Sequence, residues 1–186
     1  SLLDFSKSMS MLLKRSKRIT FFSHSVGGII PILMCKYFLK NKDIFSINYE
    51  GNLTEHDTET LTKKTVSFDF KHFIEDKFYK LLEISKNSSQ KSIRKWSLSL
   101  KKTSPEMFYK ISLECVKYSK RSITLSFFKT FFKKKVYISG QKSNLKISFC
   151  NLGSPCYKIK NTGHFSYYDD KVEFTKIFNY LLLKRC

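Results

Sequence analysis

Apolar residues at the start of the chain recur at the spacing of one helix face, as Leu2, Phe5 and Met9 illustrate. A basic stretch, 14–18, ends this pattern, and a short β-rich run, 19–22, follows it. Small residues then lead into an apolar helical segment that reaches about Leu39. The sequence therefore predicts an amphipathic helix, a strand, a tight turn and a second helix.

A second strand is predicted at residues 44–49, where apolar side chains occupy both faces. From about residue 57 to residue 130 the periodicity is helical and no strong strand pattern occurs. We interpret this stretch as several helices that form a cap.

Alternation of strand and helix resumes after the cap. Residues 136–139 predict a strand that ends at Gly140, and residues 156–159 predict another. A last helix is expected to begin near Asp169 and Asp170, since acids are favourable at a helix N-terminus. The whole pattern indicates an α/β protein with a mostly parallel sheet.

The pattern divides the chain into three parts. Residues 1–56 form the first part of the α/β core, residues 57–130 the helical cap, and residues 131–186 the last strands and the C-terminal helix. The chain opens in a helical pattern at Ser1 rather than at Met, which we interpret as the sign of a fragment or a truncated product.

Composition supports a folded protein without a membrane span. With 186 residues and 41% hydrophobic residues, one compact domain is expected. No apolar run approaches the roughly 20 residues that cross a bilayer. The odd number of cysteines and the absence of a CxxC pair predict reduced thiols in a cytoplasmic protein. These cysteines are Cys35, Cys115, Cys150, Cys156 and Cys186.

The formal net charge of +20 raises the question of anionic partners. Basic residues are scattered along the whole chain, and no nucleic-acid-binding motif accompanies them. Lys, Asn, Phe, Ile and Tyr, which have A/T-rich codons, are all abundant. We therefore attribute the charge to composition bias and expect no nucleic-acid partner.

The segment Ser23-His24-Ser25-Val26-Gly27-Gly28 joins a strand to a helix. A nucleophilic serine needs such a sharp turn, with small residues two positions before and after it. The N–H of Val26, at the start of the helix, can face a developing oxyanion. The alternative is an ordinary Gly/Ser turn. Pro31 lies inside the helical segment, so we expect a kink or a late helix start.

A second motif, Asn161-Thr162-Gly163-His164-Phe165, follows the last predicted strand and precedes the acids of the final helix. With the serine turn, it resembles the α/β-hydrolase superfamily, and the resemblance runs from Leu2 to the last helix. It implies that Ser25 is the nucleophile and His164 the general base. Ser23 stands where the family motif has its first Gly.

The resemblance leaves the acid of the triad open. The usual family position, after the strand that follows the cap, corresponds to residues 140–144, where no carboxylate occurs. Some members, including certain haloalkane dehalogenases, take the acid from the strand after the nucleophile helix. That position gives Glu50. Glu55 and Asp57 are alternatives, and we interpret both as caps of the first cap helix.

The resemblance implies a serine hydrolase that cleaves an ester, thioester or amide of a small acyl substrate through an acyl-enzyme. It implies no cofactor and no metal. Several family strands, and the loop with the second oxyanion donor, precede the helix with which this chain begins. We therefore expect the N-terminal strands to be missing, because the natural protein is longer, because another chain supplies the missing half, or because this is a decayed copy. The alternatives are an inactive truncated relic and a basic protein that binds anionic partners.

Overall fold

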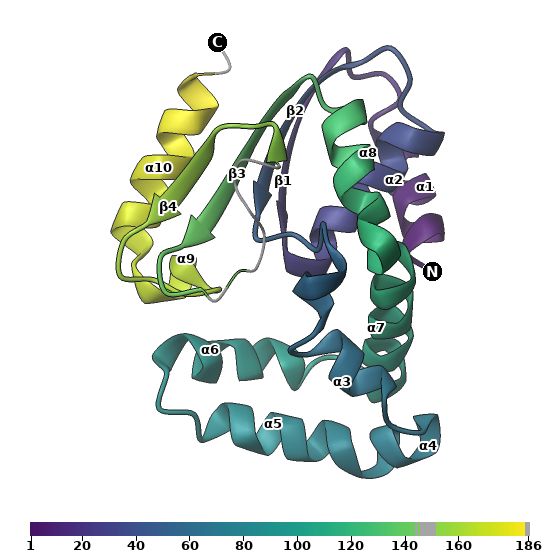
Figure 1. Ribbon diagram of the computed structural model, residues 1–186, viewed down its shortest axis with the longest axis vertical. Helices are drawn as coiled ribbons and strands as arrows, with labels where there is room; N and C mark the ends of the chain where they lie inside the picture. The colour runs from purple at the N-terminus through teal and green to yellow at the C-terminus, as the bar shows by residue number, and fades with distance from the viewer. Residues whose placement is uncertain (144, 146–151, 185–186) are drawn as a thin grey trace.

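A computed structural model describes residues 1–143, 145 and 152–184 (Figure 1). The described residues form a four-stranded sheet in the order β1-β2-β3-β4, and all three neighbouring pairs are parallel. The strands are β1 (Arg18–His24), β2 (Asp43–Tyr49), β3 (Lys134–Gly140) and β4 (Cys156–Ile159). All four predicted strands are present, so the predicted α/β class and parallel sheet are confirmed.

Helices cover both faces of this sheet. On one face lie α1 (Leu2–Leu12), α2 (Ile29–Tyr37) and α8 (Ile123–Phe131), with α2 in contact with both of its neighbours. The other face is covered by α10 (Lys171–Leu183), which follows the short α9 (Ser166–Asp169) (Figure 1). The side chain of Asp170 caps α10 by accepting the N–H of Glu173, in agreement with the predicted helix start.

Between β2 and β3, residues 50–133 contain helices and no strand. After a 3₁₀ turn η2 (Glu55–Thr58) come α3 (Thr62–Val66), α4 (Phe70–His72), the π-helical η3 (Phe73–Lys77), α5 (Phe78–Lys86), α6 (Lys91–Leu100), α7 (Pro105–Ser119), the 3₁₀ turn η4 (Lys120–Ser122) and α8. Figure 1 shows α3 to α6 beyond the carboxyl ends of the strands, as a cap would lie. The last helix of the series, α8, packs on the sheet beside α2.

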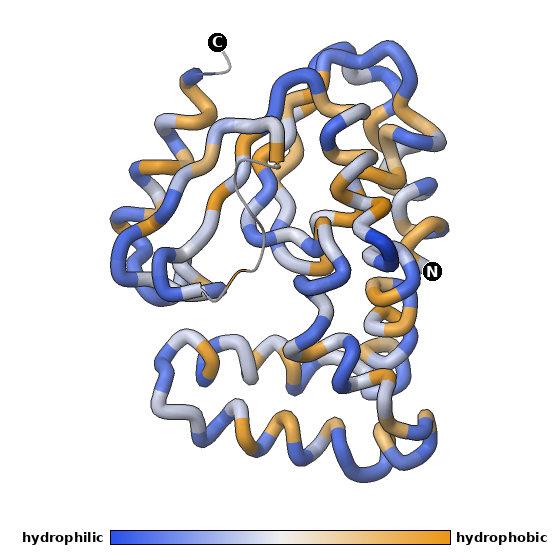
Figure 2. Tube along the Cα trace, in the orientation of Figure 1, coloured by the Kyte–Doolittle hydropathy of each residue, from blue (hydrophilic) through white to orange (hydrophobic). Residues whose placement is uncertain are grey.

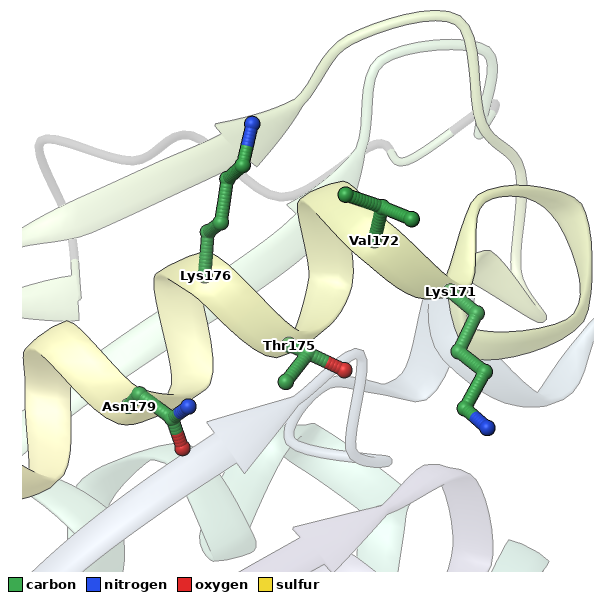
Figure 3. A pocket seen from close by; sticks show the side chains of 5 residues that line it. All are labelled: Lys171, Val172, Thr175, Lys176 and Asn179. Atoms are coloured by element: carbon green, nitrogen blue, oxygen red, sulfur yellow. The ribbon is translucent and has the colours of Figure 1, made fainter.

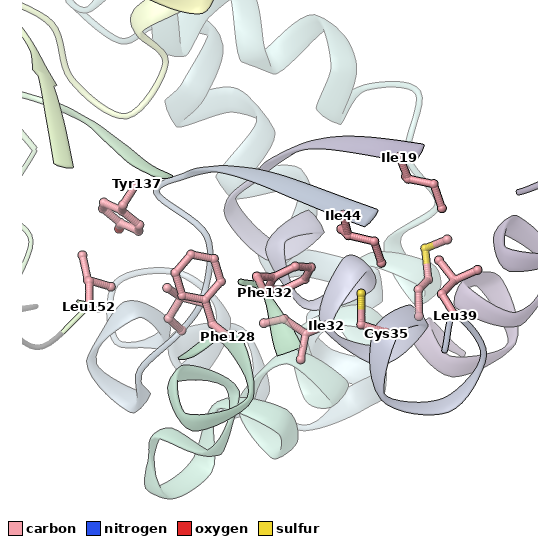
Figure 4. Packing of buried hydrophobic residues seen from close by; sticks show 11 residues of the cluster. Ile19, Ile32, Cys35, Leu39, Ile44, Phe128, Phe132, Tyr137 and Leu152 are labelled. Carbon is pink, nitrogen blue, oxygen red and sulfur yellow. The ribbon is translucent and has the colours of Figure 1, made fainter. Parts of the chain in front are cut away.

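The main core fills the space between the sheet and the helices α2 and α8 (Figure 4). Ile32 of α2 and Phe128 of α8 meet Ile44 of β2 and Tyr137 of β3 there. A second core under α10 contains Ile47 and Ile138 together with Phe174, Phe178 and Leu181 of the helix. Because β2 contributes to both cores, it is buried on both faces, as the sequence predicts.

Polar and apolar positions alternate along the helices and loops of the chain (Figure 2). None of the helices in the described part of the chain is both long and apolar enough to cross a membrane. Cys35 and Cys115 are buried free thiols, and burial raises the pKa of each to about 12. Cys150 and Cys186 lie outside the described residues.

Candidate active site

Ser25 stands at the sharp turn between β1 and the 3₁₀ helix η1 (Ser25–Gly28). Its φ of 53° is in the left-handed region, which costs a non-glycine residue about 1–3 kcal/mol. The regular helix α2 begins only at Ile29, which makes Pro31 its third residue, where a missing N–H breaks no bond. The predicted late helix start is therefore confirmed.

The close approach at this turn is made by Gly28 rather than by Gly27. A Cβ on Gly28 would lie 2.8 Å from Gly51 Cα, on the loop after β2. A Cβ on Gly27 would meet nothing within 4 Å. The serine motif thus has a steric requirement at its second glycine, because the loop that carries Glu50 passes against it.

Glu50 and His164 meet at the carboxyl end of the sheet. Glu50 directly follows β2, and its Oε2 lies 2.6 Å from His164 Nδ1. The other carboxylate oxygen accepts the N–H of Gly140, at the end of β3, at 2.7 Å. The Glu50 side chain is only 1% exposed, so it is a buried carboxylate with partners on both oxygens.

Gly140 has no room for a side chain at this point. A Cβ there would lie 2.3 Å from the carbonyl oxygen of Gly163. Because the end of β3 and the loop that carries His164 are in such close contact, the carboxylate of Glu50 can reach both. The end of β3, where the family usually has its acid, therefore contributes a backbone N–H to the site instead of a carboxylate.

Ser25 is half-buried beside this pair, and its carbonyl oxygen accepts the N–H of Asn52 at 3.1 Å. Within the described part of the chain no hydrogen bond joins Ser25 Oγ to His164. Val26 is the second residue of η1, and N–H groups in the first turn of a helix have no partner within it. The roles of Ser25, His164, Glu50 and the Val26 N–H remain predictions.

The two alternative acids point to other partners. Asp57 Oδ2 accepts hydrogen bonds from the N–H of Leu53 and from both the N–H and the hydroxyl of Thr54. Asp57 therefore closes a capping box at η2, and burial is the main cause that raises its pKa. Glu55 accepts from the N–H of Arg121 and from Lys63. Asp57 thus caps the 3₁₀ turn η2, whereas Glu55 bonds the backbone of η4 and a side chain of α3 and is not a helix cap.

His24 and Tyr49 are important neighbours to which we assigned no role from the sequence. They occupy paired register positions on β1 and β2, and their rings stack with centroids 4.6 Å apart. His24 Nε2 donates to the carbonyl oxygen of His164 at 2.9 Å. The available signal was their position, since each directly precedes a candidate catalytic residue, Ser25 or Glu50.

The loop that carries His164 is held at several points. Tyr49 Oη accepts the N–H of Ser166 at 2.6 Å, and its hydroxyl donates to the carbonyl oxygen of Gly163 at 3.1 Å. Asp169 accepts the N–H of Gly163 at 2.8 Å. These bonds fix the backbone on both sides of His164, which orients its ring toward Glu50.

His24 makes the stability of the fold depend on pH. Burial, assisted by the nearby His164, lowers the pKa of His24 to about 3 from its ordinary value of 6.5. Between these two values the unfolded chain binds a proton that the folded chain excludes. Stability should therefore fall by about 1.4 kcal/mol per pH unit as the pH drops through this window. Urea unfolding of wild type and His24→Phe at several pH values tests this. The variant should show a flatter dependence, and an equal slope would contradict the prediction.

One aromatic residue of the cap contacts the loop of His164. The ring of Trp96, on α6, stacks on Phe165 with centroids 5.8 Å apart, and Phe165 lies 5.0 Å from the ring of His164. The other cap aromatics mostly pack within the cap, around Phe73 and Phe78.

Two hollows lie on the surface of the described residues. One is lined by Lys171, Val172, Thr175, Lys176 and Asn179, all from α10, so a single helix forms it and nothing encloses a ligand (Figure 3). The other, about 260 Å³, runs along β1 and α1 and includes His24 and Gly27. Within the described residues, no group of three or more His, Cys, Asp or Glu side chains could hold a metal ion.

No protein-family model and no curated protein sequence matches the chain. Solved structures do. MenH from S. aureus is 16% identical, with a TM-score of 0.67 over 98% of this chain and 75% of that one. A thermophilic esterase from Thermogutta terrifontis is 11% identical (TM-score 0.66, 99% and 72%), and an esterase from Exiguobacterium antarcticum is 13% identical (TM-score 0.67, 97% and 74%). With its parallel sheet, its strained serine turn and the helices between β2 and β3, the chain thus adopts the α/β-hydrolase fold.

Proposed function

We propose that the protein is a serine hydrolase that cleaves an ester, thioester or amide bond through an acyl-enzyme. In this proposal Ser25 is the nucleophile, His164 the general base and Glu50 the acid that orients it. The observation that carries the proposal is the contact of 2.6 Å between the buried Glu50 carboxylate and His164 Nδ1. A buried carboxylate bonded to a histidine, next to a serine in strained backbone, is the arrangement that acyl transfer requires.

Glu50 sets the protonation of the imidazole. A carboxylate can only accept, so Nδ1 of His164 carries the proton of this hydrogen bond. In the neutral ring, Nε2 then has the free lone pair that a general base needs. When His164 takes a proton from Ser25, the negative charge of Glu50 stabilises the imidazolium.

The reaction then proceeds in two acyl transfers. Ser25 Oγ forms a bond to the substrate carbonyl carbon while its proton moves to His164 Nε2, and the N–H of Val26 stabilises the resulting oxyanion. The bond to the leaving group breaks as His164 returns the proton to it. Water, activated by His164, attacks the acyl-enzyme and releases the acid and free Ser25.

The contact between Ser25 and His164 belongs, in this proposal, to the substrate complex. Catalytic hydrogen bonds are often long in the free enzyme and shorten only when substrate is bound. Phe165 lies beside His164, Trp96 of the cap stacks on Phe165, and these two rings support a small, largely apolar acyl group as the substrate.

A fluorophosphonate probe should label Ser25, because the phosphorus is attacked by an activated serine. Peptide mass spectrometry of the labelled protein locates the modified residue. Ser25→Ala should abolish labelling, whereas Ser23→Ala, two positions away on β1, should retain it. If the folded protein is not labelled, or if Ser25→Ala is labelled equally, the proposal is wrong and an inactive relative of the hydrolases is the better interpretation.

A further inference from the structure

Three basic segments that are far apart in the sequence meet at one edge of the fold. They are residues 14–18, 40–42 and 133–135, which we call the basic edge. Each lies at or just before the amino end of a strand: β1, β2 or β3. Because the strands are parallel and pair Arg18 with Asp43 and Phe45 with Lys134, their starts are offset by no more than about 7 Å. The basic edge is therefore close to flat, and Figure 2 shows its loops as hydrophilic.

The charge at this edge is far from balanced. The three segments carry nine Lys or Arg side chains and no acid, and the nearest carboxylate, Asp43, bridges Arg18 and Lys134. The C-terminal ends of α1, α2 and α8 lie here as well, and their dipoles together supply only about −1.5 elementary charges. Helix dipoles and Asp43 together thus leave most of the positive charge unbalanced.

Apolar side chains are exposed beside the same lysines. Met11 and Leu12, in the last turn of α1, are 68% and 76% exposed. Tyr37 and Phe38, where α2 ends, are also exposed, at 47% and 37%. Large exposed apolar residues next to a basic cluster are typical of surfaces that lie in a membrane interface.

We propose that the basic edge binds the surface of an anionic lipid bilayer, with Met11 and Leu12 entering the headgroup region. Lysines near such a surface are attracted by its negative potential, and apolar residues add contact with the acyl boundary. The protein would bind the bilayer peripherally, since only loops and helix ends take part in the contact. This inference does not depend on the proposed hydrolase activity.

A bilayer fits this edge better than a nucleic acid does. Seven of its nine cations are lysines, which act as point charges, whereas specific nucleic-acid contacts favour the planar fork of arginine. Met11 and Leu12, which are more exposed than Tyr37 and Phe38, have no ring to stack on bases but can enter a lipid interface. A flat edge also matches a bilayer more closely than the groove of a duplex.

The orientation leaves the candidate active site free. Strands of seven residues separate the basic edge from the carboxyl ends, where Ser25 and Glu50 lie, by about 20 Å. A protein bound through this edge would present Ser25 and the cap to the aqueous side.

Co-sedimentation with vesicles tests the proposal. One set contains phosphatidylcholine alone and the other an equimolar mixture of phosphatidylcholine and phosphatidylserine. The protein should bind only the anionic vesicles, and added salt should weaken the binding. A variant with Lys14, Lys17, Lys40 and Lys133 all changed to Gln should bind roughly 600-fold more weakly, since each cation contributes about five-fold.

A matched variant separates the basic edge from net charge. Changing Lys71, Lys91, Lys101 and Lys110 of the cap to Gln removes the same charge from exposed positions elsewhere and should leave binding unchanged. Leu12→Ser should weaken binding, while Leu98→Ser, at an exposed cap position, should not. Circular dichroism confirms that each variant is folded. Equal losses in both lysine variants, or no binding of the wild type to the anionic vesicles while it binds duplex DNA or nothing at all, would overturn the proposal.

Discussion

Replacing His164 with alanine is expected to reduce the rate of ester hydrolysis by about 10⁶-fold, because loss of the base leaves the serine nucleophile unactivated. A p-nitrophenyl ester with a short acyl chain is a suitable substrate, since its product is coloured. The loss should appear in kcat, with little change in KM, if His164 acts on the transition state alone. The carbonyl of residue 164 can still accept the bond from His24, so the variant should fold.

A second histidine provides the control. His72, on α4 in the cap, is exposed and far from Ser25 in the sequence. His72→Ala should retain the wild-type rate. If His164→Ala keeps a substantial part of the activity, or if both variants lose it equally, His164 is not the general base.

Replacing Glu50 with glutamine should lower kcat by about 10⁴-fold, as removal of the orienting acid does in a Ser-His-Asp enzyme. The amide keeps the size of the carboxylate, and its oxygen can still accept the N–H of Gly140. It cannot, however, stabilise the imidazolium, and its NH₂ group favours the wrong tautomer of His164. The ratio of kcat to KM for the same ester measures the loss.

Asp57→Asn is the matched control for Glu50→Gln, because it makes the same chemical change in the neighbouring loop. Its effect should be a modest loss of stability through the capping box at η2, with kcat near the wild-type value. If Asp57→Asn loses most of its kcat while Glu50→Gln retains it, the acid of the triad is Asp57, in the loop after β2.

The sequence predicted those parts of the fold that depend on residues close together in the chain. Apolar runs gave the four strands, and acids placed the start of α10, since capping and burial depend on residues close in the chain. The order of strands in the sheet depends on pairing between distant segments. Periodicity carries no information about that pairing.

The residues of the candidate site could be predicted from the sequence only in part. Glu50 could be selected because the family resemblance pointed to the end of the strand after the nucleophile helix, where it is the carboxylate, and it contacts His164. The bonds of His24 and Tyr49 to the loop around His164 could not be predicted, because they require the register of β1 and β2 and the path of a loop more than 100 residues away. The steric requirement at Gly28 was missed for a similar reason, since its partner is Gly51.

The helices inserted between β2 and β3 also have a consequence for folding kinetics. The two strands pair directly, yet residues 50–133 lie between them, so their contact has a high contact order and a considerable loop-closure entropy. During synthesis, β1 and β2 leave the ribosome well before β3. Until β3 arrives, β2 exposes an unpaired apolar edge that other chains can join, and the bond from Gly140 to Glu50 cannot form. The nascent chain should therefore depend most on chaperones while the cap is being made.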